Sequence, residues 1–152
     1  MAFAKCIAEI LQESVELTGK ASILFSGGST PKGLFKALSQ QRIDWSKVKI
    51  GLVDDRMVAP ESDFSNSKLI RQCFIDLLPD VEKPTFYPLV THPFNAANNL
   101  ANALKSTLQI GIPDIVVLGM GGDGHFASLF PKDDASTVSL QEENDDVLLY
   151  TN

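Results

Sequence analysis

The sequence is poor in the residues that hold metals or cross-link chains. Among 152 residues there are two cysteines, Cys6 and Cys73, and two histidines, His92 and His125. The cysteines lie far apart and have none of the short spacings that are typical of zinc ligands. The sequence therefore predicts neither a disulfide framework nor a metal site. It favours a reduced compartment, and we expect both cysteines to be buried as small apolar residues.

Positive charge is also scarce. Lysine and arginine together number 13 against 19 acidic residues, which gives a formal net charge of −6. A nucleic-acid backbone or an anionic membrane surface requires a basic face on its partner. We therefore expect neither partner, and any anionic ligand must be held by a local positive pocket.

Long apolar runs are missing too. No stretch is long enough to cross a membrane, and no signal segment or lipidation pattern is present, so we expect a cytoplasmic protein. The composition of 44% apolar and 21% charged residues is ordinary for a globular chain. The length predicts a single domain over residues 1–152.

Strand and helix patterns alternate along the chain. Short apolar runs predict strands over residues 21–25, 48–53 and 114–118, with shorter candidates at 86–89 and 147–150. Helical spacing of apolar residues predicts helices over 3–17, 31–38, 65–79 and 93–108, with Gly19 ending the first and Thr30 capping the second. The run at 114–118 is apolar on both faces, as in a strand covered by helices on both sides. The pattern predicts a doubly wound, Rossmann-like α/β fold with a mostly parallel sheet and helices on both faces.

Three predicted strands end in unusual turns, at residues 26–30, 54–56 and 119–125. In doubly wound sheets, ligands bind in the crevice beyond the carboxyl ends of the strands. We therefore predict that these three turns meet and form the functional site.

The first turn offers backbone N–H groups to an anion. Gly27, Gly28, Ser29 and Thr30 precede a predicted helix, and glycine allows a ligand to approach the backbone closely. The turn is either a phosphate cradle or an ordinary tight connection, and the residues alone leave both open. It is not a nucleotide-hydrolase P-loop, because no Gly-Lys-Ser/Thr follows at the required spacing.

The second turn combines two carboxylates with a guanidinium. Arg56 is suited to bind a phosphate or a developing oxyanion, with Asp54 and Asp55 orienting it or a sugar hydroxyl. The alternative is a surface salt bridge.

The third turn, Gly119 to His125, contains a literal Gly-x-Gly-x-x-Gly, which raises a dinucleotide-binding alternative. Pro131 follows too soon for the long helix that this fingerprint needs. We instead predict that His125 is a catalytic base, that Asp123 orients it or the attacking water, and that Gly121 and Gly122 present backbone amides. His92 lacks such a context and is predicted to be a surface residue.

Together these turns resemble those of a known family. The resemblance rests on Ser26 to Pro31, on Asp54-Asp55-Arg56 with Val58, Ser65 and Asn66 downstream, and on Gly119 to Pro131. These segments are similar in order and spacing to the motifs of the 6-phosphogluconolactonases. The resemblance implies hydrolysis of 6-phospho-D-glucono-1,5-lactone to 6-phospho-D-gluconate in the oxidative pentose phosphate pathway, without metal or cofactor. It also implies that His125 activates water, that Arg56 binds the substrate phosphate, and that the first glycine turn and Asn66 line the pocket.

The chain departs from the family pattern in three ways. Asp55 stands where glutamate is usual, and Phe126 stands where threonine is usual. Family members are also longer: they usually have an additional strand at the start, and the segment beyond Asn152 normally adds strands, helices and a lysine of the phosphate site. The resemblance therefore implies a partial fold with an open sheet edge, through which copies of the chain can associate.

Two other functions stay open. One is a deaminase related to glucosamine-6-phosphate isomerase, although its usual Asp-Glu-Tyr and Asn-Glu-Pro motifs are replaced here by Asp54-Asp55-Arg56 and Ser128 to Pro131. The other is a non-catalytic fragment that binds a phosphosugar.

Overall fold

A computed structural model describes residues 1–141 of the chain, and its centre is a parallel sheet. The strands are β1 (Ala21–Phe25), β2 (Val48–Leu52), β3 (Thr85–Tyr87) and β4 (Ile115–Val117), in the spatial order β3-β2-β1-β4. Ile23 in β1 is aligned with Ile50 in β2 and with Ile115 in β4. The strand predicted at residues 147–150 lies outside the described residues.

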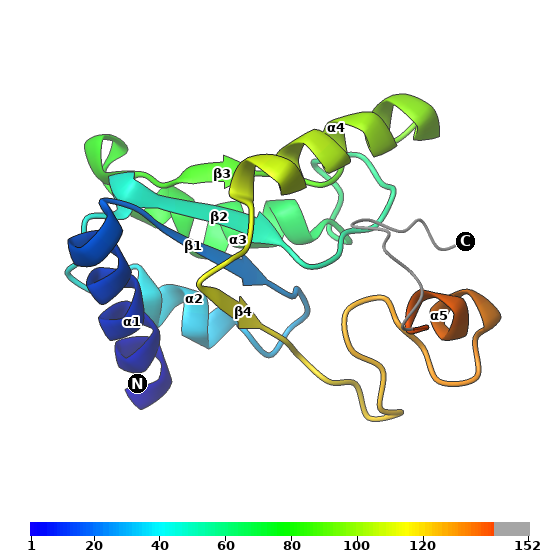
Figure 1. The fold of residues 1–152 in the computed structure, drawn as a ribbon, viewed down its shortest axis with the longest axis horizontal. Helices are drawn as coiled ribbons and strands as arrows, with labels where there is room; N and C mark the ends of the chain where they lie inside the picture. Colours follow the sequence, from blue (N-terminus) through cyan, green and yellow to red (C-terminus); the bar gives the residue numbers. More distant parts are fainter. Residues whose placement is uncertain (142–152) are drawn as a thin grey trace.

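Helices cover both faces of this sheet (Figure 1). They are α1 (Ala2–Thr18), α2 (Lys32–Leu38), α3 (Asn66–Cys73) and α4 (Ala96–Ile110), whereas the short α5 (Asp134–Ser139) lies apart from the sheet, beyond the loop that follows β4. Helix α2 packs against both α1 and α3 on one face, whereas α4 lies over β2 and β3 on the other. The predicted doubly wound α/β class is thus confirmed.

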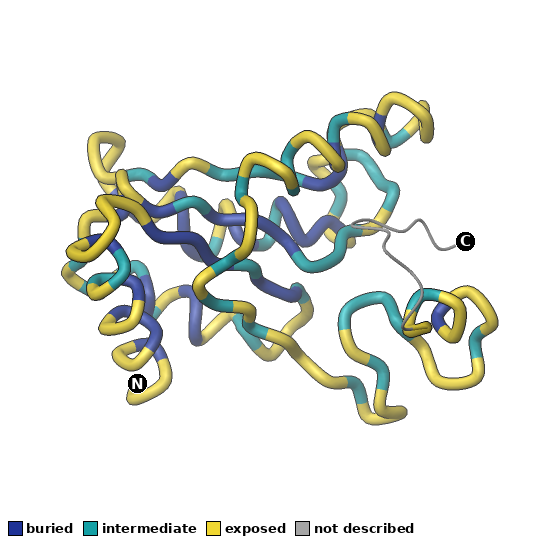
Figure 2. The backbone as a smooth tube through the Cα atoms, viewed as in Figure 1, coloured by how far each residue is buried: buried dark blue, intermediate teal, exposed yellow. Residues whose placement is uncertain are grey.

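The hydrophobic core lies between β1, β2 and the layer of α1, α2 and α3. Its largest fully buried side chains include Phe25, Phe35, Trp45 and Phe74, whose rings meet edge to face. Figure 2 shows buried residues concentrated in β1 and β2, while the chain from the end of β4 onward is mostly exposed. The two central strands therefore form the rigid base from which the functional turns emerge.

The start of the chain folds as its pattern predicts. Ile7, Leu11 and Val15 form the buried face of α1, and the helix ends at Gly19, whose N–H donates to the Val15 carbonyl oxygen over 2.9 Å. The prediction for α2 is wrong by one residue. Its N-cap is Pro31 and not Thr30, and no side chain caps it, because the proline side chain carries no hydrogen-bond acceptor.

The helix predicted over residues 65–79 is broken. Ser65 caps α3 as expected for its residue type, since its Oγ accepts from the Lys68 N–H over 3.2 Å. The helix ends at Cys73, and a separate 3₁₀ turn, η2 (Ile75–Leu77), follows. At the break, Phe74 leaves helical geometry and its ring packs against Trp45 and Phe25 in the core. Core packing therefore overrides the continuous helical pattern.

Two further boundaries shift for local reasons. Strand β3 covers Thr85–Tyr87 and not residues 86–89, because Pro88 has no N–H to continue the ladder. Helix α4 begins at Ala96 and not at Pro93, because Asn95 caps it: the Asn95 Oδ1 accepts from the Asn98 N–H over 3.0 Å.

Strand β4 is shorter and less covered than predicted. It spans Ile115–Val117, and Val116 is 46% exposed. Within residues 1–141, β4 pairs only with β1, so its other edge and part of its surface have no neighbour. The expectation of helices on both sides of this strand is therefore wrong for the described residues, while the expected open sheet edge is present there.

The cysteine prediction is wrong in part. Both cysteines are free thiols, but Cys6 lies on the exposed side of α1 and Cys73 is only partly buried.

Among the described helices, none has the length and apolar character needed to cross a membrane.

A carboxylate fixes the end of the sheet that is opposite the functional turns. Asp114 Oδ2 accepts from the N–H and the Oγ of Ser22 in β1 over 2.7 and 2.8 Å, and Oδ1 accepts from the Ser14 Oγ in α1 over 3.0 Å. Burial acts to raise the pKa of Asp114, but the hydrogen bonds from Ser22 and Ser14 outweigh it and hold that pKa below its usual value of 3.8.

This arrangement predicts a pH-dependent contribution to stability. Replacing the carboxylate in Asp114→Asn is expected to lower the free energy of unfolding by about 1 kcal/mol near neutral pH. Because the folded-state pKa is depressed, the contribution is present above the unfolded-state pKa and is lost as pH falls through the folded-state pKa. Thermal unfolding of both proteins between pH 7 and about pH 3 checks this. A difference in Tm that persists unchanged to the lowest pH would contradict it.

Candidate active site

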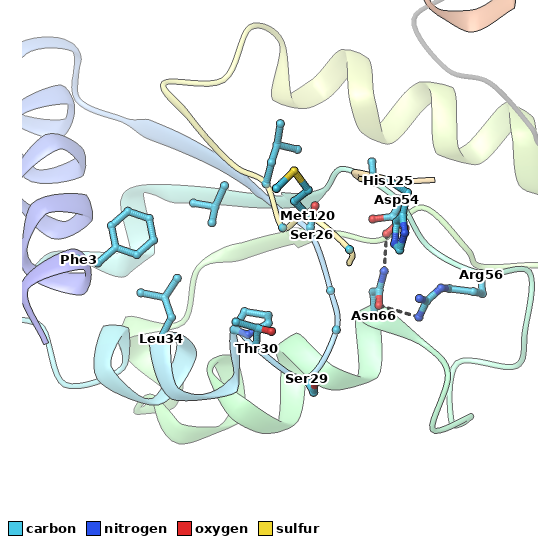
Figure 3. Close-up of a pocket in the computed structure, with 18 residues that line it drawn as sticks. Phe3, Ser26, Ser29, Thr30, Leu34, Asp54, Arg56, Asn66, Met120 and His125 are labelled. Carbon is cyan, nitrogen blue, oxygen red and sulfur yellow. Dashed lines mark hydrogen bonds between the residues drawn. The ribbon is translucent and has the colours of Figure 1, made fainter. Parts of the chain in front are cut away.

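The three polar turns meet at the carboxyl ends of β1, β2 and β4, as predicted. Residues 26–31 follow β1, residues 54–66 follow β2, and residues 118–127 follow β4, and all three segments contribute to one pocket of about 380 Å³. Figure 3 shows the pocket with the glycine turn on one side and Arg56, Asn66 and His125 on the other. A cavity of this size accommodates a small organic ligand.

Nearly all of the predicted site residues line this pocket. The lining residues among them are Gly27, Gly28, Ser29, Thr30, Asp54, Arg56, Asn66, Gly121 and His125. Gly122 and Asp123 do not line it. Gly122 is exposed, and the Asp123 carboxylate lies behind the lining residues Gly121 and His125. His92 lies elsewhere, in contact with Thr91 and Asn102, as predicted for a surface residue.

The turn after β1 depends on a close backbone approach at Gly27. A Cβ atom at this position would lie 1.8 Å from Asn66 Oδ1, so only glycine leaves room for the Asn66 side chain. The Ser26 N–H donates to the Val117 carbonyl oxygen over 2.9 Å and anchors the turn beside β4. In the part of the chain that the structure describes, the N–H groups of Gly27, Gly28 and Ser29 donate no hydrogen bond. They are available to an anionic ligand.

The turn after β2 and the start of α3 form a hydrogen-bonded unit. Asn66, which is 2% exposed, donates from Nδ2 to the Asp54 carbonyl oxygen over 2.9 Å. The Asn66 Oδ1 accepts from Arg56 Nη1 over 3.2 Å. Arg56 Nη1 also donates to the Phe64 carbonyl oxygen over 3.1 Å. Figure 3 draws the two bonds of the Asn66 side chain, to Asp54 and to Arg56.

The partners of Arg56 leave its charge available. Both guanidinium partners are neutral oxygens, and within residues 1–141 no carboxylate forms an ion pair with it. The surface salt bridge considered for Arg56 is therefore absent from the described structure. Arg56 is also the one lysine or arginine among the described pocket-lining residues. An anion in the pocket would have this guanidinium as its cationic partner.

The loop after β4 folds back on itself and does not start a helix. The Gly121 N–H donates to the His125 carbonyl oxygen over 2.8 Å, and Phe126 forms bridges with Met120 and Leu129. A dinucleotide fingerprint requires a helix directly after the glycines, so this geometry does not support the dinucleotide alternative. The imidazole of His125 packs directly on Gly121, where a Cβ atom would lie 2.2 Å from its Cε1.

The imidazole of His125 is held on two sides. Its Nδ1 lies 2.5 Å from Asp123 Oδ1, and its ring lies 4.7 Å from the ring of Phe130 between centroids. The hydrogen bonds from the ring and the backbone N–H of His125 hold the pKa of Asp123 below its usual value. An ionised carboxylate only accepts hydrogen bonds, so this contact favours the imidazole tautomer that carries its proton on Nδ1 and leaves Nε2 free to accept a proton.

The third loop is tied to the second turn. Ser128 Oγ donates to Asp54 Oδ2 over 3.0 Å, which links the loop of His125 to the turn that carries Arg56. Sequence reasoning did not identify Ser128, because its partner lies 74 positions away and no local spacing relates them.

Two apolar lining residues, Phe3 and Leu34, were also missed. Ser26 and Met120 line the pocket too, and they lie in the first and third predicted turns. Phe3 and Leu34 lie in the helices predicted over residues 3–17 and 31–38, and a helical pattern alone does not distinguish a core position from a pocket wall.

In residues 1–141, no group of three or more His, Cys, Asp or Glu side chains is placed to hold a metal ion.

Comparison with known proteins is consistent across sequence and structure. A family model described as glucosamine-6-phosphate isomerases/6-phosphogluconolactonase matches residues 1–152. A 6-phosphogluconolactonase of Rhizobium meliloti is 44% identical over 132 residues, which are 86% of this chain and 56% of the relative. One of Mesorhizobium japonicum is 35% identical over 98% of this chain and 62% of its own length. The crystal structure of a 6-phosphogluconolactonase from Shewanella baltica superposes with a TM-score of 0.80 at 39% identity, over 93% of this chain and 60% of that one.

Proposed function

Because the chain belongs to the glucosamine-6-phosphate isomerase/6-phosphogluconolactonase family, we propose that it carries the site for hydrolysis of 6-phospho-D-glucono-1,5-lactone to 6-phospho-D-gluconate. The observation that carries this proposal is the meeting of three turns around one pocket. Its wall holds the imidazole of His125, which Asp123 orients, and the guanidinium of Arg56, which bonds only neutral oxygens within residues 1–141. The chain spans 56% of the length of its Rhizobium meliloti relative, so the activity of the whole protein is part of the proposal.

The proposed first step is attack of water on the lactone carbonyl carbon. His125 accepts a proton from this water at Nε2, while the Nδ1 hydrogen bond to Asp123 stabilises the imidazolium that forms. Asp123 thus acts on the imidazole and not on the substrate. Phe130 restricts the ring from the side and fixes its orientation.

The proposed second step is ring opening. Negative charge develops on the carbonyl oxygen and is stabilised by backbone N–H groups of the glycine turns that line the pocket. The predicted donors Gly121 and Gly122 are not among them, because the Gly121 N–H donates to the His125 carbonyl oxygen and Gly122 lies outside the pocket wall. When the tetrahedral intermediate collapses, the C–O bond to the ring oxygen breaks and the leaving alkoxide takes the proton from the imidazolium. His125 serves first as base and then as acid, and no net proton is consumed in the two transfers.

The 6-phosphate is proposed to bind between the first and second turns. Arg56 is the cationic group there, and the N–H groups of Gly27, Gly28 and Ser29 supply neutral donors. Thr30, Asp54 and Asn66 complete the wall and orient the sugar hydroxyls and the guanidinium. Binding a phosphate remote from the reacting carbon converts binding energy into orientation of the ring.

The test is to measure lactone hydrolysis and 6-phosphogluconate binding side by side, with glucosamine-6-phosphate deamination as a third assay. We expect hydrolysis of the lactone and binding of its product, and no deamination. Deamination would assign the chain to the isomerase branch of the family. Binding without turnover of either substrate would show a phosphosugar-binding protein without the proposed activity.

The proposal implies a small phosphorylated sugar lactone as the ligand. A cytoplasmic location, the lack of a nucleic-acid partner and association of copies through the open β4 edge remain proposals beside it. For association, the supporting feature is the exposure of Val116 and Leu118 at that edge, at 46% and 52%.

A further inference from the structure

Asp55 stands between Arg56 and Asn66 but is itself absent from the pocket wall. Its Oδ1 accepts from the Asn66 N–H over 2.7 Å and from the Arg56 N–H over 2.9 Å. Its Oδ2 accepts from the N–H and the Oγ of Ser67 over 3.1 and 2.7 Å. One carboxylate therefore receives four hydrogen bonds, and two of the donors belong to residues that line the pocket.

These bonds join two segments that are otherwise separate in sequence. The first turn of α3 holds Asn66 and Ser67, which are 2% and 5% exposed, whereas Arg56 lies on an exposed turn after β2. The N–H groups of Asn66 and Ser67 belong to the first turn of a helix, where backbone donors have no partner within the helix. A carboxylate at this place satisfies them and also interacts favourably with the helix dipole.

The position of the Arg56 guanidinium follows from this anchor. Arg56 Nη1 is held by Asn66 Oδ1, and the Asn66 side chain is held in turn by the Asp54 carbonyl oxygen. Both bonds require that the start of α3 stay in register with residues 54–56. Within the described residues, Asp55 provides the side-chain hydrogen bonds to the backbone N–H groups of both Arg56 and Asn66.

We propose that Asp55 is a positioning residue that fixes Arg56 and Asn66 for binding of the substrate phosphate. The expected change in KM rests on the proposed function, whereas the expected change in the positions of the Arg56 and Asn66 side chains concerns the free protein. Loss of the anchor increases the disorder of the guanidinium and so weakens the phosphate contact. The chemistry at the lactone carbonyl, which depends on His125, is not altered.

The test compares Asp55→Asn with Asp114→Asn. Asp114 is a matched control, because one of its carboxylate oxygens also accepts from the N–H and the Oγ of a single serine, at the opposite end of the sheet. For Asp55→Asn we expect KM for the lactone and Kd for 6-phosphogluconate to rise about tenfold, with kcat changed less than about twofold. Asp114→Asn is expected to lower Tm and leave KM unchanged. Asp55→Glu, which restores a carboxylate, is expected to bring KM back toward the wild-type value.

The inference is overturned if Asp55→Asn lowers Tm but leaves KM and Kd at the wild-type values. If Asp55→Asn does not fold, Ser67→Ala removes one donor to the same carboxylate, and an unchanged Kd in that variant overturns the inference equally. NMR spectra of the free proteins separate this inference from the proposed function. The signals of the Arg56 guanidinium and the Asn66 side-chain amide should shift in Asp55→Asn and not in Asp114→Asn, even if the wild-type chain shows no lactonase turnover. Unchanged signals in Asp55→Asn would refute the positioning role on their own.

Discussion

His125→Ala is expected to abolish most lactonase turnover while 6-phosphogluconate binding changes little. The substitution removes the proposed proton acceptor at Nε2 and leaves Arg56, the proposed phosphate ligand, in place. Loss of a general base costs about 100- to 10,000-fold in kcat. Steady-state hydrolysis of the lactone and calorimetric titration with 6-phosphogluconate check the two halves of this expectation.

The chain offers a matched control for this variant. His92 is the other histidine, and its Nδ1 contacts Thr91 and Asn102 in a surface loop away from the pocket. His92→Ala should therefore retain kcat and KM. Turnover that is unchanged in His125→Ala would remove His125 from the mechanism, while a loss of product binding would show that the imidazole contributes to the binding of the ground state.

Gly27→Ala is expected to weaken 6-phosphogluconate binding by about 10- to 100-fold, which corresponds to loss of a hydrogen-bonded charged contact. The added Cβ would lie 1.8 Å from Asn66 Oδ1, so the Asn66 side chain must leave its place. When it moves, Arg56 Nη1 loses that acceptor, and the Asp54 carbonyl oxygen loses its donor. Isothermal titration with 6-phosphogluconate measures the effect.

A control and a second variant make this test specific. At Gly33, in α2, an added Cβ meets nothing within 4 Å, so Gly33→Ala should bind as the wild type does and be stabilised by up to about 1 kcal/mol. The effect of Gly27→Ala should also disappear in an Asn66→Ala background, because both changes remove the same contact. Additive losses in the double variant would show that Gly27 acts independently of Asn66.

The helices and strands were predictable where one periodic signal agreed with one local end signal. For α1, apolar spacing and Gly19 define the buried face and the end of the helix. Strand β1 follows the same logic, because four of its five residues are apolar and it lies directly before a glycine turn. The prediction was wrong where distant residues compete with the local pattern, as at Phe74, whose ring is drawn into the core by Phe25 and Trp45.

The residue types of the site were predictable for a different reason. Parallel strands of a doubly wound sheet all end at the same edge, so polar turns that follow such strands meet whatever their separation in sequence. This rule predicted that the turns of Gly27, Arg56 and His125 meet, and all three residues line one pocket. It carries no information on which side chains touch within that pocket.

The sequence by itself determined the α/β class, the order of its main elements and the three turns that make the site, because periodicity and strand-end position are local properties. Only the tertiary structure decided how those turns are fixed to one another. The contacts of Asp55 with Asn66, of Gly27 with Asn66 and of Ser128 with Asp54 join positions that no spacing relates. They depend on distances of a few ångströms between segments, which are set by how the strands and helices pack.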